Sequence, residues 1–165
     1  MPGDIDAVAD IQREAARWLE ECGIAMWRND ELLPARIAED INSGVFFLAA
    51  CDNEPAGTIR FELEDKLFWP DSEQHDSAFF HRLAVRRRFA GGEVSSALLL
   101  WAIARTQKLG RRYLRLDCEA SRARLRAVYE RIGFRFHSNK QVGPSFVARY
   151  EYDVMEISPG TRHRN

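Results

Sequence analysis

The sequence has few of the residues from which disulfide frameworks and cysteine metal sites are built. Among its 165 residues are three cysteines, Cys22, Cys51 and Cys118. Their number is odd, their spacing is wide and no CxxC pair occurs, which argues against a disulfide framework and a cysteine–zinc site. Each has apolar residues within a few positions in sequence, so we expect each to be a small core residue rather than a nucleophile. We expect no bound metal.

Long apolar runs and an excess of charge of one sign are also missing. No apolar run approaches the ~20 residues that a membrane-spanning helix needs. The N-terminal stretch is acidic and lacks the basic and apolar regions of a signal peptide, so we expect a cytoplasmic protein that binds no membrane. The net charge of −1 argues against nucleic acid as a partner. The content of 45% hydrophobic and 30% charged residues is typical of a folded protein.

The order of apolar patterns predicts an α/β fold. Helical spacing over about 5–21, with Asp4 as N-cap, and over about 31–42 predicts two helices. The runs 45–51 and 57–63 predict a hairpin. The other predicted elements are strand 77–85, helix 91–109, strand 113–118, helix 121–132 with Ser121 as N-cap, a strand starting at 134–136, a turn over 138–143 and a strand over 146–154. We expect one domain over 1–157 with a mixed, mostly antiparallel central sheet and helices on both faces, and a frayed tail over 158–165.

The stretch from His81 to Leu100 carries the clearest chemical signal. A strand ends in a turn that contains three arginines and two glycines, and the turn opens directly into an apolar helix. Free backbone N–H groups and the helix dipole at such a point favour an anion. Strand 77–85, helix 91–109 and strand 113–118 predict a right-handed βαβ unit with its ligand at the carboxyl end of the first strand. The stretch therefore predicts a site for a phosphate-bearing ligand.

Two pairs of segments resemble the GNAT superfamily of acyl-CoA N-acyltransferases. The first pair is Leu83–Val85 and, after the basic turn, Ser96–Leu99. The second is Leu116–Cys118 followed by Leu125–Phe134, which resembles the family's fYeklGF signature. The resemblance covers nearly the whole chain in the order of its elements. It implies the family's fold and its activity, the transfer of an acetyl group from acetyl-CoA, as a cosubstrate, to an amine.

The resemblance also implies which residues bind the coenzyme, although the loop departs from the family's pattern. In an ungapped alignment Ala90, Glu93 and Ser95 occupy the family's arginine and glycine positions. An alignment that starts at Arg88 recovers Arg88 and Gly91 but leaves Glu93 at the last glycine position. A carboxylate at 93 adds bulk and negative charge beside a pyrophosphate, unless it turns outward as a first-turn helix residue. The residues expected to bind acetyl-CoA are Leu83, Ala84, Val85, Arg88, Ala90, Gly91, Gly92, Val94, Ser95 and Ser96.

Three residues are candidates for proton transfer by the same resemblance. Tyr129 matches the tyrosine that protonates the departing thiolate, and a core aromatic is the alternative. His81 lies where an arylalkylamine-acetylating branch has a histidine that removes the amine proton; Glu119 is the second candidate base, and a merely hydrogen-bonded histidine is the alternative. Trp27 and Trp69 lie in loops where the family binds acceptors. Two indole walls suit a flat or cationic amine, whereas loop aromatics can also simply plug the edge of the core.

These residues predict direct transfer to a small amine in a ternary complex. The alternative is a catalytically silent member of the fold that binds a ligand or a partner chain, and the altered coenzyme loop favours it. A peptide or ribosomal-protein N-terminal acetyltransferase also fits the fold. Family members open with a strand before the first helix, whereas Pro2-Gly3-Asp4 resembles the turn after that strand. A homodimer through the C-terminal strand or through this front edge is compatible with the pattern.

Overall fold

The computed structural model describes residues 2–22, 38–39, 42 and 44–156, so most of the predicted helix over 31–42 lies outside the described residues. The helices and strands are α1 (Pro2–Glu21), β1 (Phe46–Cys51), β2 (Glu54–Glu62), β3 (Ser77–Val85), the 3-10 helix η2 (Arg87–Phe89), α3 (Val94–Lys108), β4 (Tyr113–Glu119), α4 (Ala123–Ile132), β5 (Arg135–Val142) and β6 (Ser145–Asp153). Among the described residues, no helix has both the length and the apolar character needed to cross a membrane.

The strands form a six-stranded sheet in the order β1-β2-β3-β4-β6-β5. The pairs β1–β2, β4–β6 and β5–β6 are antiparallel, whereas β3 and β4 are parallel. A parallel pair needs a crossover connection, and α3 lies in the connection between β3 and β4. The prediction of a mixed, mostly antiparallel sheet is therefore confirmed.

The chain forms two compact units. The first contains residues 1–62 and 80–101, and the second contains 63–79 and 102–165. The division falls inside β3 and inside α3. A single domain over 1–157 stays a prediction, and the tail over 158–165 lies outside the described residues.

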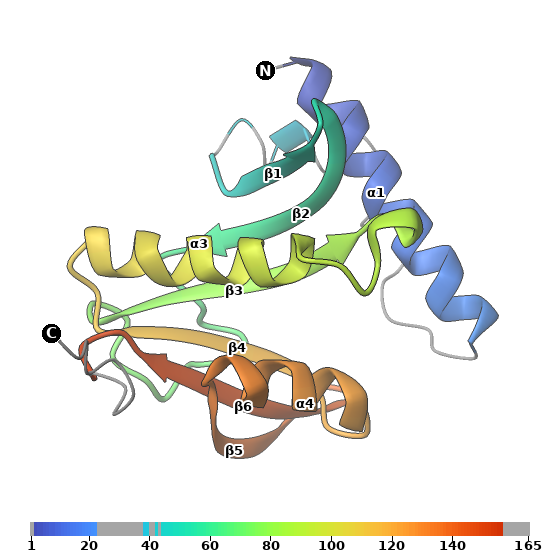
Figure 1. Cartoon of the computed structure of the whole chain (residues 1–165). Helices are drawn as coiled ribbons and strands as arrows, with labels where there is room; N and C mark the ends of the chain where they lie inside the picture. Colours follow the sequence, from blue (N-terminus) through green and yellow to red (C-terminus); the bar gives the residue numbers. More distant parts are fainter. Residues whose placement is uncertain (1, 23–37, 40–41, 43, 157–165) are drawn as a thin grey trace, which may run out of the picture. The chain divides into compact units, whose positions relative to one another are not determined.

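In the first unit, α1 packs against β1 and β2 (Figure 1). Val8 and Ala9 of α1 are buried together with Phe46 of β1. The rings of Phe47 and Trp101 lie 4.4 Å apart between centroids. The helix begins at Pro2, so the prediction of Asp4 as N-cap is wrong.

In the second unit, α4 lies along β6 and β5 (Figure 1). Its N-cap is Arg122, so the prediction of Ser121 as N-cap is wrong. It ends at Gly133 as predicted, and the φ of +121° there is one that only glycine adopts without strain. A Cβ at this glycine would lie 3.0 Å from the ring of Tyr152, so the position is restricted by space as well.

Two further predictions are corrected by the described residues. Residues 138–142 are strand rather than turn, because β5 continues through Val142 and pairs with β6 over nearly its whole length; the turn begins only at Gly143. Cys118 is buried as expected, but Cys22 is exposed because it lies in the turn after α1.

Candidate functional site

In the first unit, β3 is irregular at Arg82, whose φ is +52°. A long side chain in this left-handed region is uncommon and costs roughly 1–2 kcal/mol. The carbonyl of Arg82 accepts a hydrogen bond of 3.0 Å from Nε2 of Gln12 on α1. The irregularity lies directly between His81, the candidate base, and Leu83, the first predicted coenzyme contact.

The turn after β3 is hydrogen-bonded to β2 at its start and has open space beside it at Gly91. The N–H of Arg86 donates to the carbonyl of Ala56 at 2.8 Å, and η2 follows. Gly91 has a φ of +78°, and a Cβ built there would meet nothing within 4 Å. Glycine is needed here for its backbone conformation, and the space beside it is open. Helix α3 begins at Val94, three residues later than predicted.

The first turn of α3 combines backbone N–H groups with close packing underneath. The first N–H groups of a helix have no carbonyl partner within it, and they lie at the positive end of the helix dipole. In α3 these belong to Val94, Ser95 and Ser96, which were predicted to bind the coenzyme. Gly57 of β2 is buried, and a Cβ there would lie 2.9 Å from the Val94 side chain, so this glycine allows the close approach. The side chain of Glu93 is exposed.

Arg86 connects the turn to α1. Its Nη1 donates to Asp10 at 2.8 Å and lies 3.5 Å from a Glu14 oxygen, and its Nε donates to the carbonyl of Pro55 at 2.9 Å. With these partners, Arg86 serves to hold the turn in place.

The other two arginines of the turn also have partners in the first unit. The guanidinium carbon of Arg87 lies 3.8 Å from the centroid of the Trp18 ring. Arg88, a predicted coenzyme ligand, forms an ion pair with Glu54. Both side chains of this pair are about half exposed, so the pair contributes little stability and a phosphate can compete with the carboxylate.

In the second unit, Tyr129 is buried on α4, and Glu119 is exposed at the end of β4. The Tyr129 ring centroid lies 6.0 Å from that of Phe134 and 6.4 Å from that of Tyr150. Burial, and to a smaller extent the nearby Cys118, raises the pKa of Tyr129 well above its ordinary value. The phenol therefore keeps its proton at neutral pH, as a proton donor must.

A polar cluster that was not predicted from the sequence lies next to Tyr129. The hydroxyl of Tyr150 donates to Glu130 Oε1 at 2.6 Å and accepts from Nε of Arg126 at 2.9 Å. Burial and the bond to Glu130 raise the pKa of Tyr150. Arg126 and Glu130 lie within the signature segment, so their positions were visible in the sequence; the pairing with Tyr150 was not.

Trp69 is fully buried in the second unit, whereas it was expected to line an acceptor pocket. Its ring centroid lies 4.9 Å from the guanidinium carbon of Arg115, 4.6 Å from that of Arg149 and 5.0 Å from the His137 ring centroid. In this structure the indole anchors the loop after β2 and offers no exposed face. Trp27, the other expected wall, lies outside the described residues.

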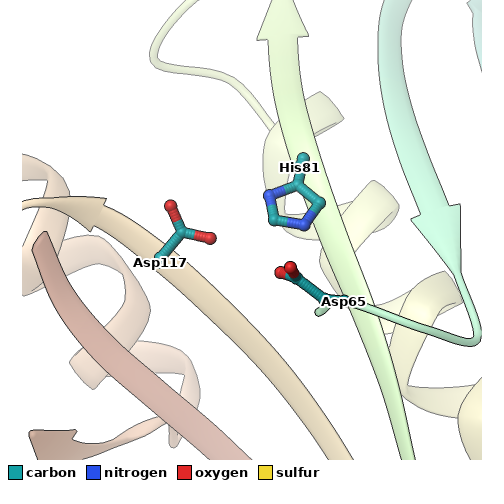
Figure 2. Close-up of side chains that lie close together, drawn as sticks. All are labelled: Asp65, His81 and Asp117. Carbon is teal, nitrogen blue, oxygen red and sulfur yellow. The ribbon is translucent and has the colours of Figure 1, made fainter. Parts of the chain in front are cut away.

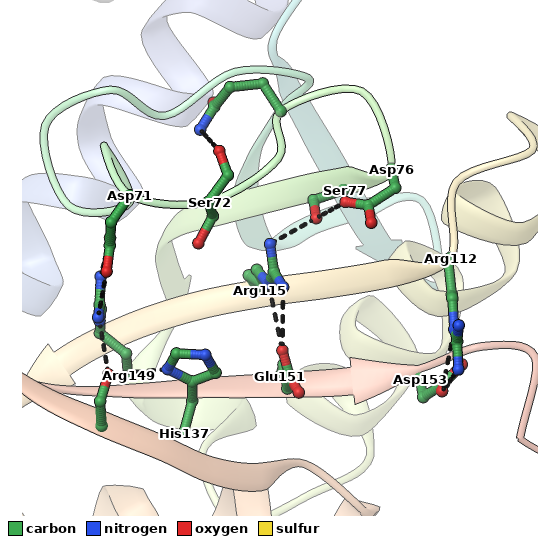
Figure 3. A network of polar contacts seen from close by, with 12 residues as sticks. Asp71, Ser72, Asp76, Ser77, Arg112, Arg115, His137, Arg149, Glu151 and Asp153 are labelled. Carbon is green, nitrogen blue, oxygen red and sulfur yellow. Dashed lines mark hydrogen bonds and ion pairs between the residues drawn. The ribbon is translucent and has the colours of Figure 1, made fainter.

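The arginines around Trp69 are held by carboxylates (Figure 3). Arg149 donates to both carboxylate oxygens of Asp71 and to the carbonyl of Phe68, which tie the loop to β6. Arg115 donates to Glu151 at 3.2 Å and to the hydroxyl of Ser77 at 2.8 Å. The network fixes the loop over this part of the sheet.

Two carboxylates of the second unit lie close together. An oxygen of Asp65 and an oxygen of Asp117 are within 4.8 Å of each other (Figure 2). Oδ1 of Asp65 also accepts hydrogen bonds from the nearby N–H groups of Leu67 and Phe68. Figure 2 also shows His81 on β3. Acidic pairs of this kind attract cations and are also common without one.

The chain matches known proteins along most of its length. The model of the acetyltransferase (GNAT) family matches residues 6–134. The uncharacterized N-acetyltransferase YesJ of Bacillus subtilis (strain 168) is 29% identical over 141 residues, which cover 81% of this chain and 77% of YesJ.

Solved structures of GNAT acetyltransferases have the same fold. The one from Streptococcus agalactiae 2603 gives a TM-score of 0.77 at 17% identity, and the one from Listeria monocytogenes 4b F2365 gives 0.74 at 23%; both comparisons cover 93% of this chain and 91% of the other. The PaiA N-acetyltransferase from Thermoplasma acidophilum, in complex with coenzyme A, gives 0.71 at 17% identity over 92% of this chain and 94% of that one. Because the family match spans well over half of the sequence, this chain belongs to the GNAT acetyltransferase family.

Proposed function

We propose that this chain is an acetyl-CoA-dependent N-acetyltransferase that acts on a small amine by direct transfer in a ternary complex. Membership of the family supports the reaction, and the PaiA structure in complex with coenzyme A supports the cosubstrate. The observation that carries the proposal is the arrangement in the first unit. There, the irregular strand β3, the open turn at Gly91 and the first turn of α3 follow one another along the chain.

The coenzyme binds along this stretch. The backbone N–H groups of Val94–Ser96 and the turn at Gly91 receive the pyrophosphate, because free N–H groups and the helix dipole both favour a negative group. Arg88 exchanges Glu54 for a phosphate oxygen. The backbone of Leu83 and Val85 contacts the acetyl group and the pantetheine arm. The exposed carboxylate of Glu93 points to solvent and leaves the N–H groups accessible.

The reaction requires one proton to be removed and one to be supplied. His81 or Glu119 takes a proton from the acceptor ammonium, and the free amine nitrogen attacks the thioester carbon. The C–N bond forms and the C–S bond breaks, and Tyr129 gives its proton to the departing sulfur. The second amine proton, lost from nitrogen as the amide forms, returns the phenol to its protonated form. The products are the acetylated amine and coenzyme A.

The proposed acceptor, a small amine, is attracted by carboxylates. A small amine is cationic at neutral pH, so the carboxylates of Asp65 and Asp117 favour its approach. The buried Trp69 acts by holding the loop that contains Asp65 rather than by stacking on the acceptor. We place this reaction in the cytoplasm.

A thermal-shift titration with acetyl-CoA tests the proposal. A ligand at ~100 times its Kd stabilises the folded state by ~2.7 kcal/mol, which raises the melting temperature by several degrees in a protein of this size. A panel of small primary amines, assayed by release of the coenzyme thiol, then identifies the acceptor. A wild-type protein that shows no shift at millimolar acetyl-CoA contradicts the proposal.

The ion pair of Arg88 with Glu54 favours a second candidate, a catalytically silent member of the family. Here the basic turn is neutralised by the protein's own carboxylates and binds no phosphate. The variants Glu54→Gln and Glu93→Gly separate the two candidates. If the site is active, wild type binds acetyl-CoA and both variants bind it somewhat more tightly; if it is silent, binding appears only in the variants or in none.

A further inference from the structure

The side chain of Gln12 links three elements of the first unit. Gln12 lies on α1 and is 0% exposed. Its Nε2 donates to Oγ1 of Thr58 on β2 at 2.7 Å and to the carbonyl of Arg82 on β3 at 3.0 Å. Because the carbonyl of Arg82 can only accept, the group facing it must be the amide nitrogen, and this fixes the orientation of the Gln12 amide.

Only the amide nitrogen of Gln12 has hydrogen-bond partners among the described residues. Its Oε1 is buried and has no hydrogen-bond partner among the residues that the structure describes. An unpartnered buried acceptor destabilises the folded protein, and an apolar side chain of the same shape avoids that penalty but leaves the Arg82 carbonyl and the Thr58 hydroxyl without this donor. The hydrogen bond to Arg82 is therefore the contribution of Gln12 that no apolar side chain can supply.

The second of these hydrogen bonds meets the strained residue of β3. Arg82 has a φ of +52°, a conformation that arginine rarely adopts without support from its surroundings. A change of φ at Arg82 would reorient the peptide groups on either side of it, and these belong to His81 and Leu83. The hydrogen bond from Gln12 therefore affects the conformation of the part of β3 that is assigned to acetyl transfer.

We infer that Gln12 is a positioning residue for acetyl transfer, which holds Arg82 in its left-handed conformation and thereby orients His81 and the backbone at Leu83. This inference rests on the proposed function, because it assigns that strand to the acetyl group. Gln12 does not touch the reacting atoms; it acts through the carbonyl of Arg82. Thr58 accepts the other hydrogen bond from the Gln12 amide and so helps to orient it, with a smaller effect on acetyl transfer.

The variant Gln12→Met removes both donated hydrogen bonds and keeps the length of the side chain. We expect its melting temperature to fall, because the carbonyl of Arg82 and Oγ1 of Thr58 lose their shared donor. We expect the Kd of acetyl-CoA to rise ~10-fold by calorimetry, and the Kd of coenzyme A, which lacks the acetyl group, to rise less than ~3-fold. A merely structural role would change the two affinities equally. Thr58→Val is the second variant, with a smaller change in the same direction.

The conformation of Arg82 is tested by two double variants. Glycine adopts a φ of +52° without strain, so Gln12→Met with Arg82→Gly should recover the wild-type ratio of the two affinities. Gln12→Met with Arg82→Ala loses the same arginine side chain but keeps the strain, so it should not recover. The alanine variant therefore controls for the contacts of the Arg82 side chain itself.

The outcomes separate this inference from the proposed function. If wild type binds acetyl-CoA and Gln12→Met keeps the wild-type ratio of affinities, the role of Gln12 is refuted while the proposed function stands. The same holds if the glycine and alanine double variants behave alike. If wild type binds neither acetyl-CoA nor coenzyme A, the proposed function falls and the role of Gln12 falls with it.

Discussion

Arg149 of β6 and Asp71 of the loop after β2 form an ion pair in which Nη1 lies 2.7 Å from Oδ1. The arginine side chain is buried, whereas that of Asp71 is 55% exposed. The hydrogen bond from Arg149 lowers the pKa of Asp71 from 3.8 to about 2, against the smaller effect of burial. The loop is therefore anchored by a charge interaction that acid removes.

The first prediction concerns the acid stability of this loop. A carboxyl group whose pKa is lowered in the folded state stabilises the protein above its unfolded pKa of 3.8, and this contribution is lost as the pH falls through about 2. Because Asp71 is more than half exposed, solvent screening leaves a contribution of about 1 kcal/mol. Urea unfolding of wild type and Asp71→Asn should differ by this amount at pH 6, and the difference should shrink steadily below pH 4.

The exposed acid Glu73 provides the control for this prediction, because it lies in the same loop. Glu73→Gln should lie close to wild type at every pH. A difference between wild type and Asp71→Asn that does not change between pH 6 and pH 3 would show that the ion pair does not set the stability of the loop.

The second prediction concerns Trp69, whose ring contacts two guanidinium groups. Replacing a fully buried indole with a methyl group leaves a large cavity, so Trp69→Ala should lower the free energy of unfolding by about 3–5 kcal/mol. Trp18→Ala is the comparison, because Trp18 is partly exposed, and it should cost less than about 1 kcal/mol. Equal losses in the two variants, measured in urea, would refute the anchoring role of Trp69.

The third prediction separates Tyr129 from its neighbour Tyr150. Tyr129→Phe removes the proposed proton donor, so kcat should fall about 100-fold while the Kd of acetyl-CoA stays within about twofold. Tyr150→Phe leaves Glu130 and Arg126 without their shared partner, so it should lower the free energy of unfolding by about 1–2 kcal/mol and leave kcat near wild type. Full turnover in Tyr129→Phe, on an acceptor from the amine panel, rules out its role as proton donor.

The fourth prediction concerns cysteine reactivity. Burial, and to a smaller extent the negative charge of the nearby Asp117, raises the pKa of Cys118 to about 11. At pH 8 only about one molecule in a thousand then carries the reactive thiolate, so Cys118 should resist iodoacetamide. Cys22 is exposed and should react first, with Cys51 between the two. Timed alkylation followed by peptide mass spectrometry gives the order, and Cys118 reacting as fast as Cys22 would contradict its burial.

Patterns within single elements predicted much of the fold. The strand predicted over 77–85 has the observed bounds of β3, and the glycine at 133 marks the end of α4 as predicted. The turn predicted over 138–143 was wrong for residues 138–142, where Ser138, Asn139 and Lys140 are poor strand formers by composition. The segment is a strand because its backbone pairs with β6. Polar residues are tolerated there because β5 is the edge strand of the sheet, and much of its surface is exposed to solvent.

The candidate site was less predictable, because its main features depend on contacts between distant residues. Nothing local in the sequence marks Arg82 as a residue with positive φ, and its support from Gln12 comes from 70 residues away. Arg115 and Arg149 have the alternation of solvent-facing strand residues. They are buried because the loop after β2 covers them, and Trp69 of that loop is buried against them.

Calorimetric titration with acetyl-CoA of wild type, Gly91→Ala and Gly143→Ala tests the coenzyme site most directly. Both glycines have positive φ and open space at the Cβ position, so alanine should cost each about 1 kcal/mol of stability. Gly91 lies in the proposed pyrophosphate turn, whereas Gly143 lies between β5 and β6. We predict a micromolar Kd for wild type and Gly143→Ala and a Kd at least ~10-fold higher for Gly91→Ala. No binding by wild type, or equal binding by all three proteins, contradicts the proposed site.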